Sequence, residues 1–207
     1  MIIAIDGPSA SGKSTTAKGV AEKLEITHVD TGAMYRAFTL GLKLSEISPD
    51  DDTSVCQYLS EIELYFDGNN KIHLNGVDVS YEIRSGDISS RVSAVSAIPK
   101  VREKMVITQR RIAGEQNCVL EGRDIGTVVF PNADFKFFLI ADIDVRAKRR
   151  LIELEKMGET KFISELIEDI RRRDQLDSSR DHSPLIQAED AIPIDTSQLT
   201  ILSLIHI

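Results

Sequence analysis

A glycine-rich segment near the start of the chain constrains the fold more strongly than any other feature. It follows the apolar run Met1–Ile5 and precedes residues 15–24, which are compatible with a helix. The segment comprises Gly7, Pro8, Ser9, Ala10, Ser11, Gly12, Lys13 and Ser14, and the helix-compatible residues begin with Thr15. A strand followed by Gly-x-x-x-x-Gly-Lys-Ser and then by a helix is the pattern of a phosphate-binding P-loop.

The P-loop pattern has a physical basis. The glycines let the backbone turn tightly enough to point several N–H groups at one small volume. The helix that follows adds the positive end of its dipole, so a triphosphate can bind there. In such a loop Lys13 would reach the β- and γ-phosphates, and the Ser14 hydroxyl would ligate Mg²⁺. We therefore expect residues 7–15 to bind a nucleoside triphosphate together with Mg²⁺.

The composition is that of a soluble globular protein. The chain of 207 residues is long enough for one domain with a sizeable core, and 42% of it is hydrophobic. No apolar run approaches the roughly 20 residues that span a bilayer, and the first apolar run continues straight into the P-loop. The net charge of −8 argues against a general nucleic-acid binder. Cys56 and Cys118 lack metal-type spacing and are typical of reduced thiols. We expect a cytoplasmic monomer without a signal peptide and without a membrane or nucleic-acid partner.

Helical and extended patterns alternate along most of the chain, which indicates an α/β fold. We expect strands at residues 2–5, 26–29, 119–120 and 135–141, and helices at 15–24, 33–44, 89–114 (with a second helix opening at Pro99), 145–157 and 161–176. Residues 47–54 are polar and are expected to form a linker. The predicted architecture is a P-loop NTPase core with a central parallel sheet flanked by helices.

A different pattern interrupts this alternation. Residues 61–67 alternate with a period of two, and the turn Gly68–Asn70 leads into 71–74. Asn75-Gly76 then forms a second turn into 77–79. Short strands joined by Asn/Gly turns are typical of an antiparallel meander. We therefore expect a small inserted antiparallel β meander.

Basic residues gather in clumps at Arg110-Arg111, Arg146–Arg150 and Arg171–Arg173. Runs of charge are usually solvated helix faces, but a chain that binds a triphosphate must also neutralise several phosphate charges. Arginine does so with two parallel hydrogen bonds. No Ser-His-Asp or Cys-His constellation stands out, so nucleophilic catalysis by a side chain is not indicated.

Several motifs, taken in order, resemble those of the bacterial cytidylate kinase family. They are Asp6–Thr15, Asp30–Arg36, Ile98–Arg102, Glu121–Pro131 and Arg173–Arg180. The resemblance extends over nearly the whole chain, up to Asp195-Thr196. It implies a single kinase domain, residues 1–207, with a core at about 1–45 and 115–207. A nucleoside-monophosphate-binding insert would occupy about 46–114, and a short helical lid would lie within about 146–162.

The resemblance also implies a reaction, the ATP-dependent phosphorylation of CMP and dCMP to CDP and dCDP in pyrimidine nucleotide metabolism. In-line transfer of the γ-phosphoryl group to an acceptor that is already anionic needs charge neutralisation and alignment rather than a strong base. The catalytic cations implied by the family are Lys13, Arg36, Arg123, Arg149 and Arg150. Arg180 would join Arg36 and Arg123 on the acceptor phosphate. One of the two lid arginines, Arg149 and Arg150, could instead only pair with Glu153.

The remaining CMP-binding residues implied by the family surround the base and the sugar. Asp124 matches the base-reading carboxylate, which accepts from the cytosine amine, and Ser93 and Arg102 complete a polar pocket. The alternative for Asp124 is that it caps the local turn at Ile125-Gly126. Arg173 and Asp177 would hold the sugar hydroxyls, with Thr31 nearby where many relatives carry serine. Glu121 stands where an aspartate is common, next to the expected Mg²⁺.

Two other classes of protein use a P-loop of this kind. A P-loop kinase for another small acceptor, such as adenylate or shikimate, leaves the meander and the cytosine-type pocket unexplained. A GTPase-type switch would need an Asn-Lys-x-Asp motif, which the sequence lacks. The last residues, Leu202–Ile207, do not complete the amphipathic helix that begins near Ser197, and we expect that they replace a native tail.

Overall fold

The computed structural model describes residues 1–206, apart from the side chains at 201 and 205. The chain forms two compact units. Unit 1 contains Met1–Asp30 and the chain from Ala113 onward, and unit 2 contains Thr31–Ile112. The domain bounds expected from the sequence stay a prediction. The expectation that residues 202–207 replace a native tail also stays a prediction, and Ile207 lies outside the described part.

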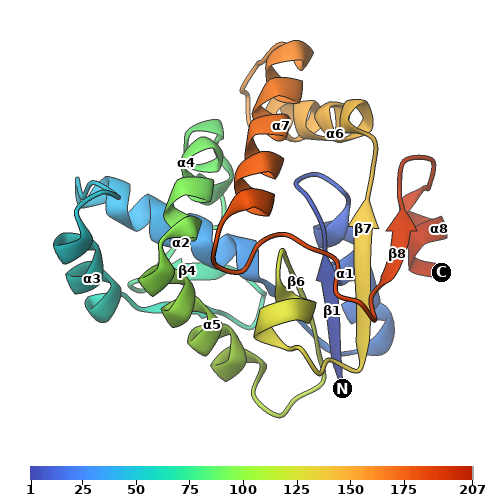
Figure 1. The fold of residues 1–207 in the computed structure, drawn as a ribbon, viewed down its shortest axis with the longest axis horizontal. Coiled ribbons are helices and arrows are strands. Elements are labelled where there is room, and N and C mark those ends of the chain that lie inside the picture. Colours follow the sequence, from blue (N-terminus) through green and yellow to red (C-terminus); the bar gives the residue numbers. More distant parts are fainter. Residues whose placement is uncertain (207) are drawn as a thin grey trace. The chain divides into compact units, whose positions relative to one another are not determined.

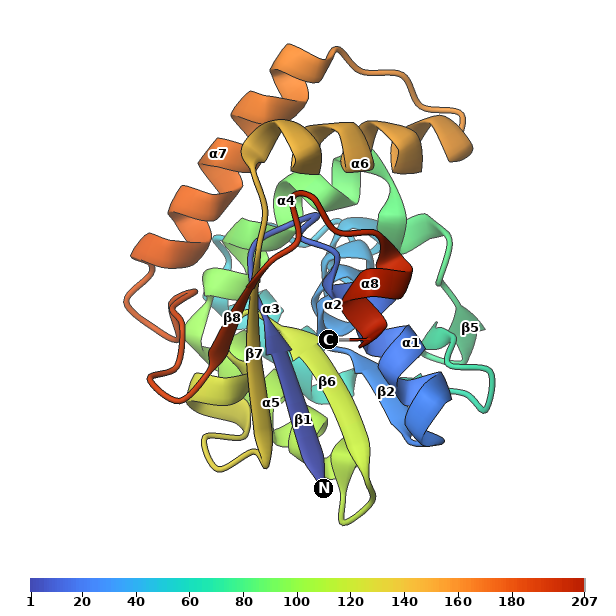
Figure 2. The same cartoon turned by 90° about the vertical axis from the view of Figure 1, so that its right-hand side faces the viewer.

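A parallel sheet forms the centre of unit 1 (Figure 2). In the described part of the chain it has five strands in the order β2-β6-β1-β7-β8, and each neighbouring pair is parallel. The strands are β1 (Ile2–Asp6), β2 (Thr27–Asp30), β6 (Cys118–Gly122), β7 (Phe135–Ile140) and β8 (Ile192–Asp195). Because β1 is central, the P-loop at its carboxyl end lies between the ends of β6 and β7. Asp6 pairs in register with Gly122 on one side and Phe138 on the other. The predicted central parallel sheet is confirmed.

Within unit 1, helix α1 packs against the central strands of the sheet (Figure 1). α1 buries Ala17 and Ala21 in a core with Ile3, Ile5 and Leu139. α6 packs against α7 around a separate apolar cluster. α8 lies beside α1, as Figure 2 shows. The helices of unit 1 are α1 (Lys13–Leu24), α6 (Ile143–Lys156), α7 (Ile163–Ser179) and α8 (Ile201–His206). None of the helices in the described residues is long and apolar enough to cross a membrane.

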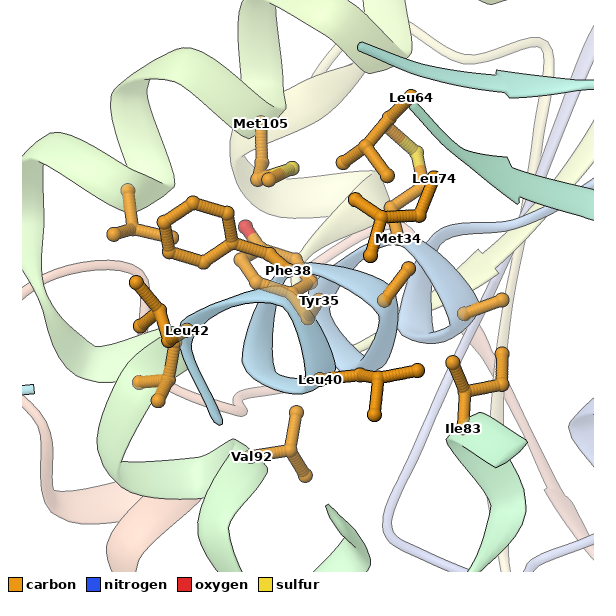
Figure 3. Close-up of a cluster of buried hydrophobic side chains, with 14 of the residues drawn as sticks. Met34, Tyr35, Phe38, Leu40, Leu42, Leu64, Leu74, Ile83, Val92 and Met105 are labelled. Atoms are coloured by element: carbon orange, nitrogen blue, oxygen red, sulfur yellow. The ribbon is translucent and has the colours of Figure 1, made fainter. Parts of the chain in front are cut away.

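Unit 2 is built around α2, whose apolar side chains fill its core (Figure 3). Met34 lies among Leu64 and Leu74 of the small antiparallel sheet, and Phe38 is fully buried. The elements of unit 2 are α2 (Thr31–Leu44), α3 (Asp52–Glu61), β3 (Leu64–Phe66), β4 (Ile72–Leu74), β5 (Val77–Asp78), a 3₁₀ turn (Glu82–Arg84), α4 (Gly86–Ala97) and α5 (Pro99–Ala113). β3, β4 and β5 pair antiparallel, so the predicted meander is confirmed. Its Asn75-Gly76 turn has positive φ at both residues, as that dipeptide favours.

α3 and β8 were not expected from the sequence, and the first strand of the meander was expected too long. α3 begins inside the predicted linker, where Asp51 accepts a hydrogen bond from the Ser54 amide and so caps the helix. The run 61–67 is a strand only at Leu64–Phe66, because α3 extends to Glu61. β8 was missed because Pro193 lowers the strand propensity of a short segment; as an edge strand, β8 tolerates the proline.

The contact between α2 and α3 generates a stability prediction. An alanine in place of a mid-helix glycine usually stabilises a helix by about 0.5–1 kcal/mol. At Gly41, however, an added Cβ would collide with the ring and hydroxyl of Tyr58. We expect Gly41→Ala to lower the free energy of unfolding by about 1–3 kcal/mol, measured by urea denaturation. In a Tyr58→Ala background the same substitution should cost much less; an equal cost there would contradict the collision.

Candidate active site

The P-loop leaves the end of β1 in a conformation that requires glycine. Gly7 and Gly12 have φ of 147° and 96°, and a Cβ at Gly7 would collide with the Leu139 carbonyl oxygen of β7. The Lys13 Nζ folds back over the loop and donates to the Pro8 carbonyl at 2.7 Å. The loop therefore curls closely around its own lysine, at the start of α1.

Lys13 is a buried cation among other cations. The pKa of Lys13 is lowered to about 7, first by burial and then by the nearby Arg123 and Arg173, whereas Glu121 and Asp6 oppose the change. A site that crowds positive charge in this way favours a polyanion, which would restore the charged lysine.

A hydroxyl and a carboxylate meet beside the loop. Ser14 Oγ donates to Glu121 Oε2 at 2.6 Å, and the other carboxylate oxygen of Glu121 lies 3.0 Å from His28 Nε2. Oxygen donors of this kind are those that Mg²⁺ prefers. Among the described residues no group of three or more His, Cys, Asp or Glu could hold a metal by itself. Ser14 and Glu121 therefore fit an Mg²⁺ ion that takes its other ligands from phosphate and water, and sequence reasoning did not foresee the contact with His28.

Arginines surround a buried carboxylate near the same strand ends. Arg123 Nε donates to Asp177 Oδ2 at 2.9 Å, and Arg180 Nη1 lies 4.0 Å from Asp177 Oδ1. Burial by itself would raise the pKa of Asp177, but Arg123, Arg173 and Arg180 outweigh it and hold that pKa below its usual value. Arg173 Nη1 also approaches the P-loop, 3.4 Å from Ser9 Oγ. These predicted residues therefore lie together.

The turn that carries Asp124 is fixed by a different aspartate. Asp6, the last residue of β1, accepts from the Ile125 amide at 2.9 Å and from the Gly126 amide at 2.7 Å. The side chain of Asp124 caps nothing in the π-helical turn Ile125–Val129 that follows it. The alternative that Asp124 caps this turn is therefore wrong. Asp6 performs that function, and Asp124 is buried at the end of β6.

The arginines of α6 differ in what they contact. Arg149 Nη1 lies 3.4 Å from the Ala10 carbonyl of the P-loop, and Arg146 Nη1 lies 3.3 Å from the Ser9 carbonyl. Arg150 donates to Glu153 at 3.0 Å, the pairing that the sequence left open for one of the two lid arginines. Arg146 was not predicted; its place one helical turn before Arg149 and Arg150 was the signal that could have found it.

The other predicted residues belong to unit 2. Thr31 begins α2, and Arg36 follows in its second turn. The Arg102 guanidinium lies 5.4 Å from the centre of the Tyr35 ring and donates to the Ser96 carbonyl at 3.1 Å. The Ser93 hydroxyl is buried, and its oxygen has no hydrogen-bond partner among the described residues. Because buried hydroxyls are usually paired, an unpaired one fits a missing polar ligand. The roles given to these residues stay predictions.

The comparisons with known proteins agree with one another. A sequence model of the family described as cytidylate kinase matches residues 3–207. A cytidylate kinase of Caldanaerobacter subterraneus subsp. tengcongensis is 50% identical over 96% of this chain and 88% of its own length. One of Fusobacterium nucleatum is 47% identical over 100% of this chain and 94% of its own. Among solved structures, shikimate kinase from Bacteroides thetaiotaomicron matches with a TM-score of 0.50 at 14% identity, covering 100% of this chain and 94% of that one. That structural likeness shows the fold alone.

The anchoring carboxylate Asp6 generates a prediction about pH. Burial raises its pKa to about 6 from an ordinary 3.8, against the opposing effect of the Gly126 and Ile125 amides. Because the folded pKa lies above the unfolded one, this group's stabilising contribution is complete below about pH 4 and is lost as the pH rises to about 6. Asp6→Asn cannot titrate. The free energy of unfolding of the wild type minus that of the variant should fall by about 2–3 kcal/mol between pH 4 and pH 7, measured by urea denaturation. A difference between the two free energies of unfolding that stays constant from pH 4 to pH 7 would contradict the raised pKa of Asp6.

Proposed function

Because this chain belongs to the cytidylate kinase family, we propose that its P-loop and the arginines around it form the site of phosphoryl transfer. The activity is the ATP-dependent phosphorylation of CMP and dCMP by a P-loop kinase. A kinase for another small acceptor is not favoured, since the similarity to the shikimate kinase structure extends only to the fold. The observation that carries the proposal is the convergence of Lys13, Arg123, Arg149 and Arg173 on one loop.

The donor would bind along the P-loop. Its backbone amides and the positive end of α1 would hold the phosphates of ATP, and Lys13 would exchange the Pro8 carbonyl for phosphate oxygens. Ser14, with Glu121 behind it, would hold Mg²⁺. This ion supplies neutralisation of phosphate charge when bound.

The acceptor phosphate would be held by Arg36, Arg123 and Arg180. It is already an anion, so the protein's task is to bring two anions into line rather than to remove a proton. Asp177 orients Arg123 through its 2.9 Å contact with Nε, and Nη1 makes only a long contact of 3.4 Å with the Gly122 carbonyl, so the two Nη groups would turn to phosphate. Arg149, and Arg150 after release from Glu153, would supply positive charge at the transferring group.

The nucleoside would be read by the remaining residues. Asp124 would accept from the cytosine amine, and the buried hydroxyl of Ser93 and the guanidinium of Arg102 would complete the contacts to the base. Arg173 and Asp177 would bind the sugar hydroxyls, with Thr31 close to them. We further propose that the protein acts in the cytoplasm as a monomer, without a membrane or nucleic-acid partner; sedimentation of the purified chain tests the oligomeric state.

A panel of acceptors tests the substrate directly. ADP formation from ATP should be measured with CMP, dCMP, UMP, AMP and shikimate at equal concentrations. CMP and dCMP should be clearly preferred. A preference for AMP or shikimate would overturn the proposal.

Removing the P-loop lysine tests the donor site. Lys13→Ala should lower kcat by several orders of magnitude, because it deletes a positive charge beside the developing transition state. Thermal unfolding of the variant should stay close to that of the wild type. Lys18→Ala, an exposed lysine of α1, is the matched control and should keep full activity. Activity of Lys13→Ala within about tenfold of wild type would contradict the role of the lysine.

Asparagine at position 124 tests the reading of the base. Loss of one buried, charge-assisted hydrogen bond should cost about 2–4 kcal/mol in kcat/KM for CMP, which is roughly a thirtyfold to thousandfold loss. The loss for UMP should be much smaller, because the wild-type carboxylate already opposes the uracil oxygen. The CMP/UMP selectivity should therefore fall by at least about tenfold, whereas the exposed control Asp144→Asn should leave it unchanged. Equal losses for both bases would assign Asp124 to support of Arg123 instead.

A further inference from the structure

Thr196 is a fully buried residue that uses all of its polar groups in connecting three parts of unit 1. It lies directly after β8 and is 1% exposed. Its hydroxyl donates to the Ser11 carbonyl of the P-loop at 2.9 Å and accepts from Arg149 Nη1 at 3.0 Å. Its own carbonyl accepts from Arg149 Nη2 at 2.7 Å, and its amide donates to the Ile140 carbonyl at 2.8 Å. One residue therefore connects the end of β7, the P-loop and α6.

The Arg149 guanidinium is oriented by this residue more than by any other. Two of its nitrogens donate to the two oxygens of Thr196, which fixes both the position and the plane of the group. Its third contact, to the Ala10 carbonyl, is longer at 3.4 Å. The same nitrogen Nη1 would lie 3.8 Å from a Cβ at Gly12, so the guanidinium covers the loop immediately before Lys13.

The partners of Arg149 leave its charge uncompensated. Among the described residues it contacts only carbonyl and hydroxyl oxygens and no carboxylate. The arginines beside it on α6 differ, since Arg146 pairs with Asp174 and Arg150 with Glu153. Burial lowers the pKa of Arg149, which shows that this cation is partly desolvated, and no carboxylate of the described residues pairs with it. A phosphate group on the loop would supply a counter-ion.

We propose that Thr196 is a positioning residue that holds the Arg149 guanidinium over the P-loop and so sets the position of this cation for phosphoryl transfer. The inference rests on the proposed role of Arg149 at the transferring group. Thr196 acts through Arg149 and makes no contact with substrate itself. The hydroxyl is essential to this arrangement, because the carbonyl alone leaves Nη1 with only its long contact to Ala10.

The test is a double-mutant cycle on kcat. Thr196→Val keeps the shape of the side chain and removes the hydroxyl, and Thr196→Ser is the matched control that keeps it. We expect Thr196→Val to lower kcat by about tenfold, with KM for ATP and CMP changed by less than about twofold. Thr196→Ser should restore kcat to within about twofold of the wild type. In an Arg149→Ala background, Thr196→Val should have no further effect on kcat, because the group that it positions is gone.

Each contrary outcome has a distinct meaning. If Arg149→Ala leaves kcat unchanged, the proposed role of Arg149 fails, and the inference about Thr196 fails with it. If Arg149→Ala lowers kcat and adding Thr196→Val to it lowers kcat again by the same factor as in the wild type, Thr196 acts only through the Ser11 carbonyl. In that case the inference about Thr196 alone is overturned. If Thr196→Val does not fold, Thr196→Ala replaces it in the same cycle.

A measurement independent of turnover completes the test. The side-chain NMR signals of Arg149 in the nucleotide-free protein should show restricted rotation of the guanidinium in the wild type and in Thr196→Ser. Faster rotation is expected in Thr196→Val. Equal rotation in all three proteins would overturn the inference.

Discussion

The register in which β1 pairs with β6 and β7 determines where the polar groups of unit 1 can lie. Asp6 stands opposite Gly122 and Phe138, so the chain segments that leave these strands begin at one edge of the sheet. The P-loop continues from β1, and Arg123 and Asp124 continue from β6. Parallel strands place their carboxyl ends together, and ligands of open α/β sheets bind at that edge. Asp6 strengthens the arrangement, because its carboxylate joins the end of β1 to the turn after β6.

Charge is distributed unevenly over this edge. Several arginines are matched with carboxylates: Arg123 with Asp177, Arg146 with Asp174 and Arg150 with Glu153. Lys13 and Arg149 instead donate to neutral oxygens. These two side chains, which donate to neutral oxygens, therefore lie at the P-loop itself, where a bound triphosphate would face them. Arginines that are already paired act by orientation as much as by charge, because the carboxylate fixes the plane of the guanidinium.

Local patterns in the sequence predicted the parts of this structure that depend on neighbours along the chain. The P-loop, the Asn75-Gly76 turn and the helix that opens at Pro99 are set by the backbone preferences of their own residues. The roles of Asp6 and Thr196 could not be predicted this way, since Asp6 contacts Gly126 and Thr196 contacts Ser11 across more than a hundred residues. The residues around the P-loop were found through motifs. The different contacts of Arg146, Arg149 and Arg150 could not be found that way, because they depend on which acceptor lies near each guanidinium in the folded chain.

The place of Pro193 in β8 has a consequence for the behaviour of the protein at high concentration. β8 is the last strand of the sheet, and Ile192 beside the proline is 57% exposed. An apolar strand with one edge unpaired is a template on which a strand from another molecule can add. Proline has no amide hydrogen to offer an incoming chain, and its ring fixes the backbone in a shape that such a chain would have to follow. Pro193 lowered the strand propensity so that β8 was not predicted, and it also disfavours the addition of another strand at this edge of the folded protein.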